Sequence, residues 1–151
     1  MPNVWIFNAN PKVYPLDQEL EDPDLTEACW TLNTSWHQIK KGDLALHWIS
    51  GERGFFSLVE ITSDPYWTWY EKEDVNENYL KPGKNYFVDY RYIVKFQRPF
   101  LEPEIKKIPG LENLQIFRYR EGSVKKIKPD EWDILYQELK NRGFLRSPQG
   151  P

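Results

Sequence analysis

The sequence predicts an α+β domain built on a small β-barrel with helices packed outside it. Two apolar runs carry this prediction, Leu44–Ile49 and Phe55–Ile61, joined by Ser50-Gly51-Glu52-Arg53-Gly54. Runs of this length, rich in aromatic and β-branched residues and separated by glycine, are typical of paired strands. Neither run alternates between apolar and polar residues, so both faces of the hairpin are expected to be covered. An aromatic content of 16% also favours a β-rich core.

The N-terminal part adds two short strands around an acidic segment. Val4–Phe7 is a predicted strand, ended by the Asn and Pro residues of 8–11. Residues 16–28 are acidic and predict a loop with a short helix. Trp30–Leu32 predicts a second short strand, and residues 34–39 predict a helical turn.

After the central hairpin, an aromatic segment and a long strand are expected. Residues 66–70 hold four aromatic side chains, and the polar stretch 71–85 predicts a loop. Tyr86–Phe96 is rich in aromatic and β-branched residues and predicts a long strand that ends before Pro99. A short helix or turn and then a late strand are expected downstream, at Pro103–Lys107 and Leu114–Tyr119.

The C-terminal helix is the clearest element of the sequence. Pro129 suits its first turn, and the acidic pair that follows suits the positive end of the helix dipole. Apolar side chains at i, i+3, i+4 and i+7 form a stripe that packs on the core, namely Trp132, Leu135, Tyr136 and Leu139. Gly143 is the expected terminator. We expect one domain over residues 1–151, with a core from about residue 4 to residue 143 and a loose tail at 144–151.

Composition limits the compartment in which the chain is expected. A single cysteine, Cys29, excludes an internal disulfide and suits a reducing environment. No apolar run is as long as a membrane-spanning helix, and the N-terminus lacks the basic and apolar stretches of a signal peptide. We therefore expect a soluble, cytoplasmic protein without a membrane partner.

The net charge of −3 hides an asymmetry along the chain. Residues 81–128 hold twelve Lys and Arg against five Asp and Glu, a net of +7, whereas the rest of the chain is at −10. A chain with little net charge can therefore present a basic face to nucleic acid. The same counts also fit charges scattered over the surface, and the sequence leaves both arrangements open.

The sequence lacks the motifs of common catalytic and metal sites. Its two histidines, His37 and His47, and its one cysteine show no zinc-binding spacing. It holds neither a glycine-rich phosphate loop nor a GxSxG motif, and no carboxylate pair stands out for acid–base chemistry. His47 lies inside an apolar run and is interpreted as a hydrogen-bonded core residue. We predict a binding module without a cofactor or a metal, rather than an enzyme.

Several short motifs, taken in order, resemble the EVE domain, a PUA-like family related to YTH domains. They are Trp5–Lys12, Trp30–Asn33, Ile39–Asp43, Trp48–Gly51, Gly54–Ile61, Ser63–Pro65, Pro109–Leu111, Gly122-Ser123 and Pro129–Trp132. The resemblance runs from about residue 4 to residue 139. It implies a small, strongly bent β-barrel of about five to six strands, flanked by helices. The chain departs from the family pattern in a longer insertion at 66–85, and in Lys128, which stands where a capping Thr or Ser is usual.

This resemblance also implies a function. EVE and YTH domains hold an extruded, modified base in an aromatic pocket, and EVE domains are associated with methylated or hydroxymethylated cytosine in DNA. By resemblance, Trp30 would be one wall of this pocket and Trp67 the other, with Trp69 as the alternative. The groups that would read the polar edge of the base are Asn10, Asn33, Ser50 and the backbone of Gly51. Core packing stays open as the alternative role of each tryptophan, and it is the preferred role of Trp48.

Phosphate contacts would supply much of the affinity of such a site. Extruding a paired base costs a few kcal/mol, and stacking on aromatic rings returns about 1–3 kcal/mol. The candidate phosphate-binding residues are Lys40, Lys41, Arg118, Arg120, Lys125 and Lys126. A hydrophobic pocket distinguishes one methyl group by roughly 10–200-fold at best. We therefore expect modest discrimination and a clear dependence on salt.

Two alternative functions stay open. A methylated base of RNA would suit the same pocket, since PUA-like domains commonly serve RNA. An enzyme acting on a nucleobase or a small molecule rests only on the presence of a pocket. The family resemblance also admits a role as the sensor of a modification-dependent restriction system, with a nuclease or motor domain in the same chain or a partner chain.

Overall fold

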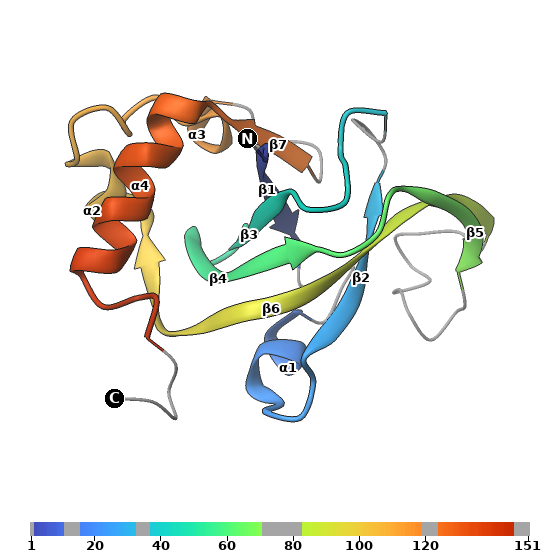
Figure 1. Ribbon diagram of the computed structural model, residues 1–151. Helices are drawn as coiled ribbons and strands as arrows, with labels where there is room; N and C mark the ends of the chain where they lie inside the picture. Colours follow the sequence, from blue (N-terminus) through green and yellow to red (C-terminus); the bar gives the residue numbers. More distant parts are fainter. Residues whose placement is uncertain (1, 11–15, 33–36, 71–82, 119–123, 147–151) are drawn as a thin grey trace.

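The computed structural model describes residues 2–10, 16–32, 37–70, 83–118 and 124–146, which form seven strands and four helices (Figure 1). The strands are β1 (Val4–Ala9), β2 (Glu27–Leu32), β3 (Leu44–Ile49), β4 (Gly54–Ile61), β5 (Tyr66–Tyr70), β6 (Gly83–Leu101) and β7 (Val124–Ile127). The helices are α1 (Leu16–Glu21), α2 (Glu102–Lys106), α3 (Gln115–Arg118) and α4 (Pro129–Asn141). Among the described residues, no helix is long and apolar enough to cross a membrane.

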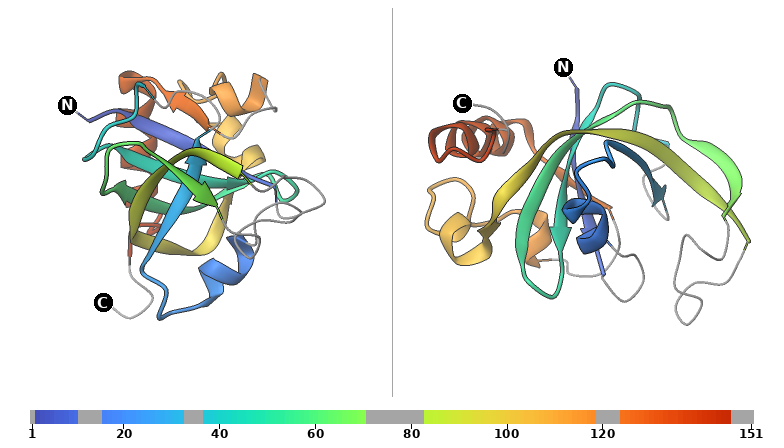
Figure 2. Two further views of the ribbon diagram at one scale, coloured as in Figure 1. Left: turned by 90° about the vertical axis from the view of Figure 1, so that its right-hand side faces the viewer. Right: turned by 90° about the horizontal axis from the view of Figure 1, so that it is seen from below.

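The strands form one mixed sheet in the order β2-β6-β4-β3-β1-β7, and β5 also pairs with β6. The predicted hairpin of β3 and β4 is confirmed as an antiparallel pair. β1 runs parallel to β3, and the other pairs are antiparallel. The sheet curls strongly, which is clearest in the right-hand view of Figure 2. The result is a half-barrel, as the fold prediction required.

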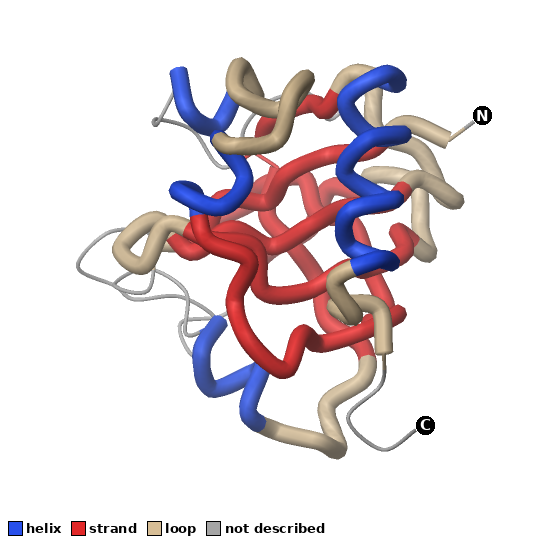
Figure 3. The backbone as a smooth tube through the Cα atoms, turned by 90° about the vertical axis from the view of Figure 1, so that its left-hand side faces the viewer, coloured by secondary structure: helices blue, strands red, loops and turns tan. Residues whose placement is uncertain are grey.

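Both faces of the central strands are covered, as the unbroken apolar runs predicted. Alternate residues of β1 enter two different clusters, because successive side chains of a strand point to opposite faces. Val4 and Ile6 pack on one face with residues of α2, α3 and α4, and we call it the helix face. Trp5 and Phe7 pack on the other face with Trp30 and residues of α1, and we call it the aromatic face. In Figure 3, α2, α3 and α4 lie over the sheet on the helix face.

Helix α4 confirms the predicted apolar stripe at Leu135 and Leu139, which are fully buried. Trp132 is only partly buried against this core, and Tyr136 is 40% exposed, so the prediction that Tyr136 packs on the core is wrong. Gly143 ends the helix as expected, with a φ of 82° in the left-handed region. The N–H of Phe144 then donates to the carbonyl of Leu139 at 2.9 Å. Phe144 is buried and stacks on Phe100 at 4.7 Å between ring centroids. The core therefore continues beyond Gly143, into a residue that we had expected in the loose tail.

At the N-terminus of α4, Lys128 occupies the capping position without a side-chain hydrogen bond to the helix. The carboxylate of Glu131 accepts instead from the backbone N–H of Lys128 at 3.0 Å. Pro129 follows in the first turn, where its missing N–H removes no helical bond. The departure at Lys128 is thus compensated by the third residue of the helix.

The predicted late strand at Leu114–Tyr119 is wrong. Residues 115–118 form helix α3, and the N–H of Phe117 donates to the carbonyl of Leu114 at 3.0 Å. A short apolar run fits a helical turn as well as a strand, so the pattern alone could not decide. The strand lies further along the chain, at β7. Its two central lysines interrupt the apolar pattern, although Val124 and Ile127 on either side of them are buried.

Strand β6 is longer at both ends than the sequence predicted. It begins at Gly83, inside the expected loop, because residues 83–87 pair with the aromatic strand β5. It also continues past Pro99. The register shifts there, because Phe55 faces Phe100 whereas Ser57 faces Lys95. Pro99 falls inside this irregularity, where a missing N–H interrupts no ladder.

The rest of the expected loop, residues 71–82, and residues 34–36 of the predicted helical turn lie outside the described residues.

Candidate nucleic-acid interface

Trp30 and Trp67 project from the same face of the sheet. Trp67 lies opposite Tyr86 on β6, and Tyr86 lies opposite Leu32 on β2, two residues beyond Trp30. Cross-strand partners share a face, and so do residues two apart on a strand. Leu32 and Trp30 are buried on the aromatic face, so Trp67 belongs to that face as well. The pairing of β2 and β5 with β6 therefore places on one face two tryptophans that are 37 positions apart in the sequence.

The two tryptophans differ in exposure. Trp67 keeps 54% of its surface exposed and meets the Tyr86 ring edge-on, with 4.8 Å between ring centroids. Trp30 is only 5% exposed. It stacks on Phe7 at 5.0 Å with an interplanar angle of 2°. Trp67 thus offers an accessible stacking surface, whereas Trp30 is packed among other rings, and its role as a pocket wall stays a prediction.

The interior of the aromatic face holds polar groups that the sequence did not single out as site residues. His47 is fully buried, and its Nδ1 lies 2.6 Å from Ser57 Oγ, which confirms the interpretation as a hydrogen-bonded core histidine. Burial lowers the pKa of His47 to about 3, so the ring is neutral at ordinary pH. The rings of Trp30, Tyr90 and Tyr92 surround it at 5.1–5.7 Å. Alternating aromatic residues along β6 were the available sequence signal for this cluster.

A carboxylate from α1 lies behind these rings. The hydroxyls of Tyr90 and Tyr92 both donate to Glu19 Oε1 at 2.5 Å. Lys95 holds the same segment, because its Nζ donates to the carbonyls of Glu19, Asp22 and Leu25 at 2.7–2.9 Å. Burial lowers the pKa of Lys95. These bonds fix the acidic segment against β6, and the ammonium group of Lys95 is used in holding it.

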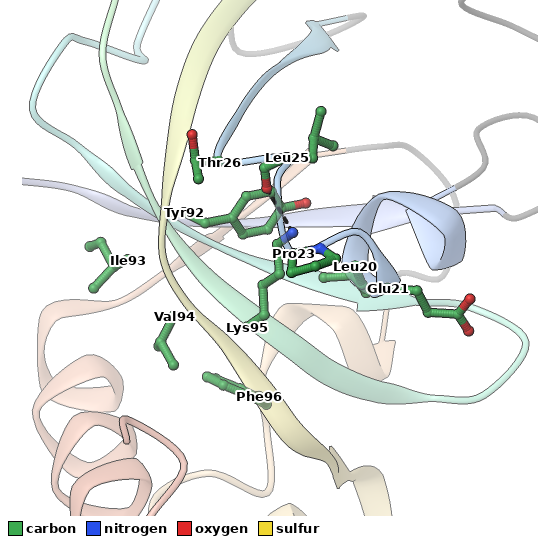
Figure 4. A pocket seen from close by; sticks show the side chains of 10 residues that line it. All are labelled: Leu20, Glu21, Pro23, Leu25, Thr26, Tyr92, Ile93, Val94, Lys95 and Phe96. Atoms are coloured by element: carbon green, nitrogen blue, oxygen red, sulfur yellow. Dashed lines mark hydrogen bonds between the residues drawn. The ribbon is translucent and has the colours of Figure 1, made fainter. Parts of the chain in front are cut away.

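A groove of about 370 Å³ opens between this acidic segment and the middle of β6 (Figure 4). Its walls are mainly apolar and include Leu20, Leu25, Ile93 and Phe96. None of the predicted base-binding or phosphate-binding residues lines it. The groove is therefore separate from the predicted site.

Asn10, Ser50 and Gly51 lie together at the ends of two parallel strands. The N–H of Ser50 donates to the carbonyl of Ala9 at 3.0 Å, which sets Ser50 beside Asn10. Asn10 and Gly51 are exposed, and a Cβ at Gly51 would meet no atom within 4 Å. The backbone here is therefore open to a ligand. This group lies beside the Leu101 end of β6, whereas Trp67 lies beside the opposite end, so the structure does not bring them together.

Of the two other predicted base-binding residues, the structure describes only Trp69, and that only by its place in the strand pairing. Trp69 is opposite Lys84 in the pairing of β5 with β6, and this register puts it two residues beyond Trp67 on the same strand. Asn33 lies outside the described residues. Both stay predictions.

Three of the predicted phosphate-binding lysines gather at the β5 end of the sheet. The backbone N–H of Lys40 donates to Asp43 Oδ2 at 3.0 Å, and so does Trp5 Nε1. Lys126 lies over the Trp5 ring, with its Nζ 5.7 Å from the centroid. The N–H of Lys41 donates to Asp64 Oδ1 at 2.9 Å, just before β5. Lys40, Lys41 and Lys126 are all exposed, and we call them the basic group. Lys41 connects this group to the segment before β5, because Asp64 lies three residues before Trp67.

Two other predicted basic residues, Lys125 and Arg118, do not join this group. Lys125 is opposite Ile6, a residue of the helix face. Arg118 belongs to α3, and its Nη2 donates to Asn113 Oδ1 at 3.2 Å. Arg120 lies outside the described residues. In the described part of the chain, no three His, Cys, Asp or Glu side chains are arranged to hold a metal ion.

A curled mixed sheet with α2, α3 and α4 on one face and α1 on the other is consistent with the PUA-like class of folds. A model of the EVE domain matches residues 3–138, and the chain belongs to this family. No curated protein matches the chain. A hypothetical protein from Leishmania major has a similar structure, with a TM-score of 0.72 at 16% identity. That match covers 95% of this chain and 98% of the other.

Two further similar structures contain nucleic acid. Human THYN1 was solved in complex with DNA that contains 5-methylcytosine. Its structure matches with a TM-score of 0.65 at 18% identity, and the match covers 90% of this chain and 96% of that one. The YTH domain of Zygosaccharomyces rouxii MRB1 was solved with N6-methyladenosine RNA. It has a TM-score of 0.55 and 13% identity, covering 99% of this chain and 88% of that one.

Proposed function

We propose that this chain is a binding module for a modified base of nucleic acid, in the first instance a methylated or hydroxymethylated cytosine of DNA. The observation that carries this proposal is the shared face of Trp30 and Trp67, of which Trp67 is exposed. Membership of the EVE family and the methylcytosine DNA bound by THYN1 support it. No catalytic group is needed for this function.

In this proposal Trp67 stacks on the extruded base, and the inner rings around Trp30 close the site. Stacking of one base on an aromatic ring is worth about 1–3 kcal/mol, which does not exceed the cost of extruding it from a duplex. Lys40, Lys41 and Lys126 supply the phosphate contacts that make up the difference. A polar role for Asn10, Ser50 and Gly51 requires a nucleic-acid strand that reaches the other end of β3.

Binding to one duplex with cytosine, 5-methylcytosine or 5-hydroxymethylcytosine at a single position tests the proposal. We expect the wild type to prefer a modified duplex, and Trp67→Ala to lose that preference with a fall in affinity of roughly 5–100-fold. Tyr136→Ala is the matched control, since Tyr136 is an aromatic residue of α4 with 40% of its surface exposed. Equal binding of all three duplexes by a folded wild type would contradict the proposal.

A methylated base of RNA is the second candidate, favoured by the similarity to a YTH domain solved with N6-methyladenosine RNA. Competition between DNA and RNA strands of one sequence, each with one methylated base, separates the two candidates. An RNA reader is expected to lose affinity when the 2′-hydroxyls next to the base are removed. A place in a modification-dependent restriction system, beside a nuclease or motor partner, is a further proposal that rests on the family resemblance alone.

A further inference from the structure

His47 carries a buried ring nitrogen that no described residue bonds. Its Nδ1 pairs with Ser57 Oγ at 2.6 Å, but its Nε2, which is equally buried, meets no donor or acceptor within the part of the chain that the structure describes. Buried side-chain nitrogens are nearly always paired in folded proteins, so an exception calls for an explanation. A ligand that supplies the missing partner is one such explanation.

The position of His47 relates this nitrogen to the proposed base site. The His47 ring lies 5.2 Å from Trp30 and 6.0 Å from Phe7, between centroids. Phe7 belongs to β1, which is paired on both sides, whereas Trp30 belongs to β2, which stands at the edge of the sheet. A side chain on an edge strand is less constrained than one in the centre. Trp30 is therefore the ring of this cluster that comes from an edge strand, and its displacement would uncover His47.

We propose that His47 is the hydrogen-bonding residue at the closed end of the base-binding site. In this inference Trp30 leaves its stack on Phe7 and stacks on the incoming base, whose polar edge then bonds to Nε2 of His47. The inference rests on the proposed function and adds a specificity-determining residue to it. The ligand is a planar, neutral heterocycle that carries a ring nitrogen, a carbonyl or an amino group at its edge.

The hydrogen bond to Ser57 allows both neutral tautomers of His47. A hydroxyl can donate or accept, so Ser57 can pair with either tautomer of the neutral imidazole. If Ser57 donates to Nδ1, then Nε2 carries the proton and donates to a ring nitrogen or a carbonyl of the base. If Nδ1 donates to Ser57, then Nε2 accepts from an amino group. Cytosine presents both kinds of group on one edge, so either tautomer finds a partner.

NMR of histidine ring nitrogens in the wild type tests the contact directly. Addition of an oligonucleotide with the modified base is expected to shift the His47 Nε2 resonance and to fix one tautomer. His37, which is exposed, is the internal control and should change little. An unchanged His47 resonance in protein saturated with the modified oligonucleotide would overturn the inference.

A variant pair gives the second test. His47→Asn keeps a polar atom near the position of Nδ1, toward Ser57, and removes Nε2. It is expected to weaken binding of the modified duplex by roughly 3–10-fold and to leave the salt-dependent binding of the unmodified duplex unchanged. His37→Asn should change neither. If the wild type prefers the modified duplex and a folded His47→Asn prefers it equally, then this inference is wrong and the proposed function stands. If the wild type shows no preference, both are wrong.

Discussion

The two faces of the central strands bury different kinds of side chain. On the helix face, Phe100, Leu135 and Leu139 pack in an apolar core without exposed surface, and the buried carboxylates of this side, Glu102 and Glu131, belong to the first turns of α2 and α4. On the aromatic face, His47 and Ser57 are buried among rings, and Glu19 is bonded to two tyrosine hydroxyls. Buried polar groups cost desolvation, and a domain that needed only stability could have apolar residues in their place. Under the proposed function, the helix face maintains the fold and the aromatic face binds the base.

The charged groups of the helix side fit this division. Arg53 in the β3–β4 turn makes a bidentate pair with Glu102 at the start of α2, and its Nη2 lies 2.6 Å from Oε1. Hydrogen bonding from Arg53, together with Lys106, lowers the pKa of Glu102. This pair ties the hairpin to the helices. It stabilises the structure above the lowered pKa of Glu102, and that contribution is lost as the pH falls through it.

The largest expected effect comes from the helix face. Phe100→Ala removes a fully buried ring that stacks on Phe144, and should lower the free energy of unfolding by about 3–5 kcal/mol. Urea denaturation measures this change. Ile93→Ala is the control on the same strand, since Ile93 is 47% exposed and should cost much less. The folded fraction of Phe100→Ala should keep its preference for a modified base. A selective loss of that preference would contradict the assignment of base binding to the aromatic face alone.

A smaller effect is expected from the titration of His47. Its pKa is lowered from 6.5 to about 3 in the folded state, so the unfolded chain binds a proton that the folded chain excludes. The free energy of unfolding should therefore fall as the pH is lowered below about 6.5, by about 2 kcal/mol between pH 7 and pH 5. Denaturation at a series of pH values measures this slope. His47→Asn should lose it and His37→Asn should keep it. A slope unchanged in His47→Asn would show that another group is responsible.

The smallest effect concerns the basic group. Lys40→Ala with Lys41→Ala should reduce the slope of log K against log salt by about 0.7–0.9 for each phosphate contact removed. The ratio of affinities for modified and unmodified duplexes should not change, because these contacts carry no base information. Lys140→Ala, an exposed lysine of α4, is the control. A changed ratio in the double variant would place base recognition near the lysines.

The elements whose residues lie close together in the sequence could be predicted from local patterns. The hairpin of β3 and β4 follows from apolar runs and turn residues and is confirmed, and the stripe of α4 follows from periodicity and is confirmed at Leu135 and Leu139 but not at Tyr136. The extension of β6 past Pro99 depends on an irregular register with β4, which the sequence of β6 does not show. The assignment of Leu114–Tyr119 failed because six apolar and polar residues do not distinguish a helical turn from a strand.

The candidate site depended more strongly on long-range pairing. Lys40 and Lys126 meet around Asp43 and Trp5 only because β7 returns to pair with β1. The deep burial of Trp30 requires Phe7 from another strand, so composition could not reveal it. The separation of Ser50 from Trp67 along β6 was equally hidden, although both match motifs of one family.

Amide chemical shifts during titration test the division between the faces most directly. The protein would be titrated with a duplex that carries one modified cytosine and, separately, with its unmodified twin. We expect the shifts that differ between the two titrations to fall on β2, β5 and the first half of β6, with α2 and α4 unaffected. Differences concentrated on α2 and α4, or none at all while both duplexes bind, would contradict a base-reading aromatic face.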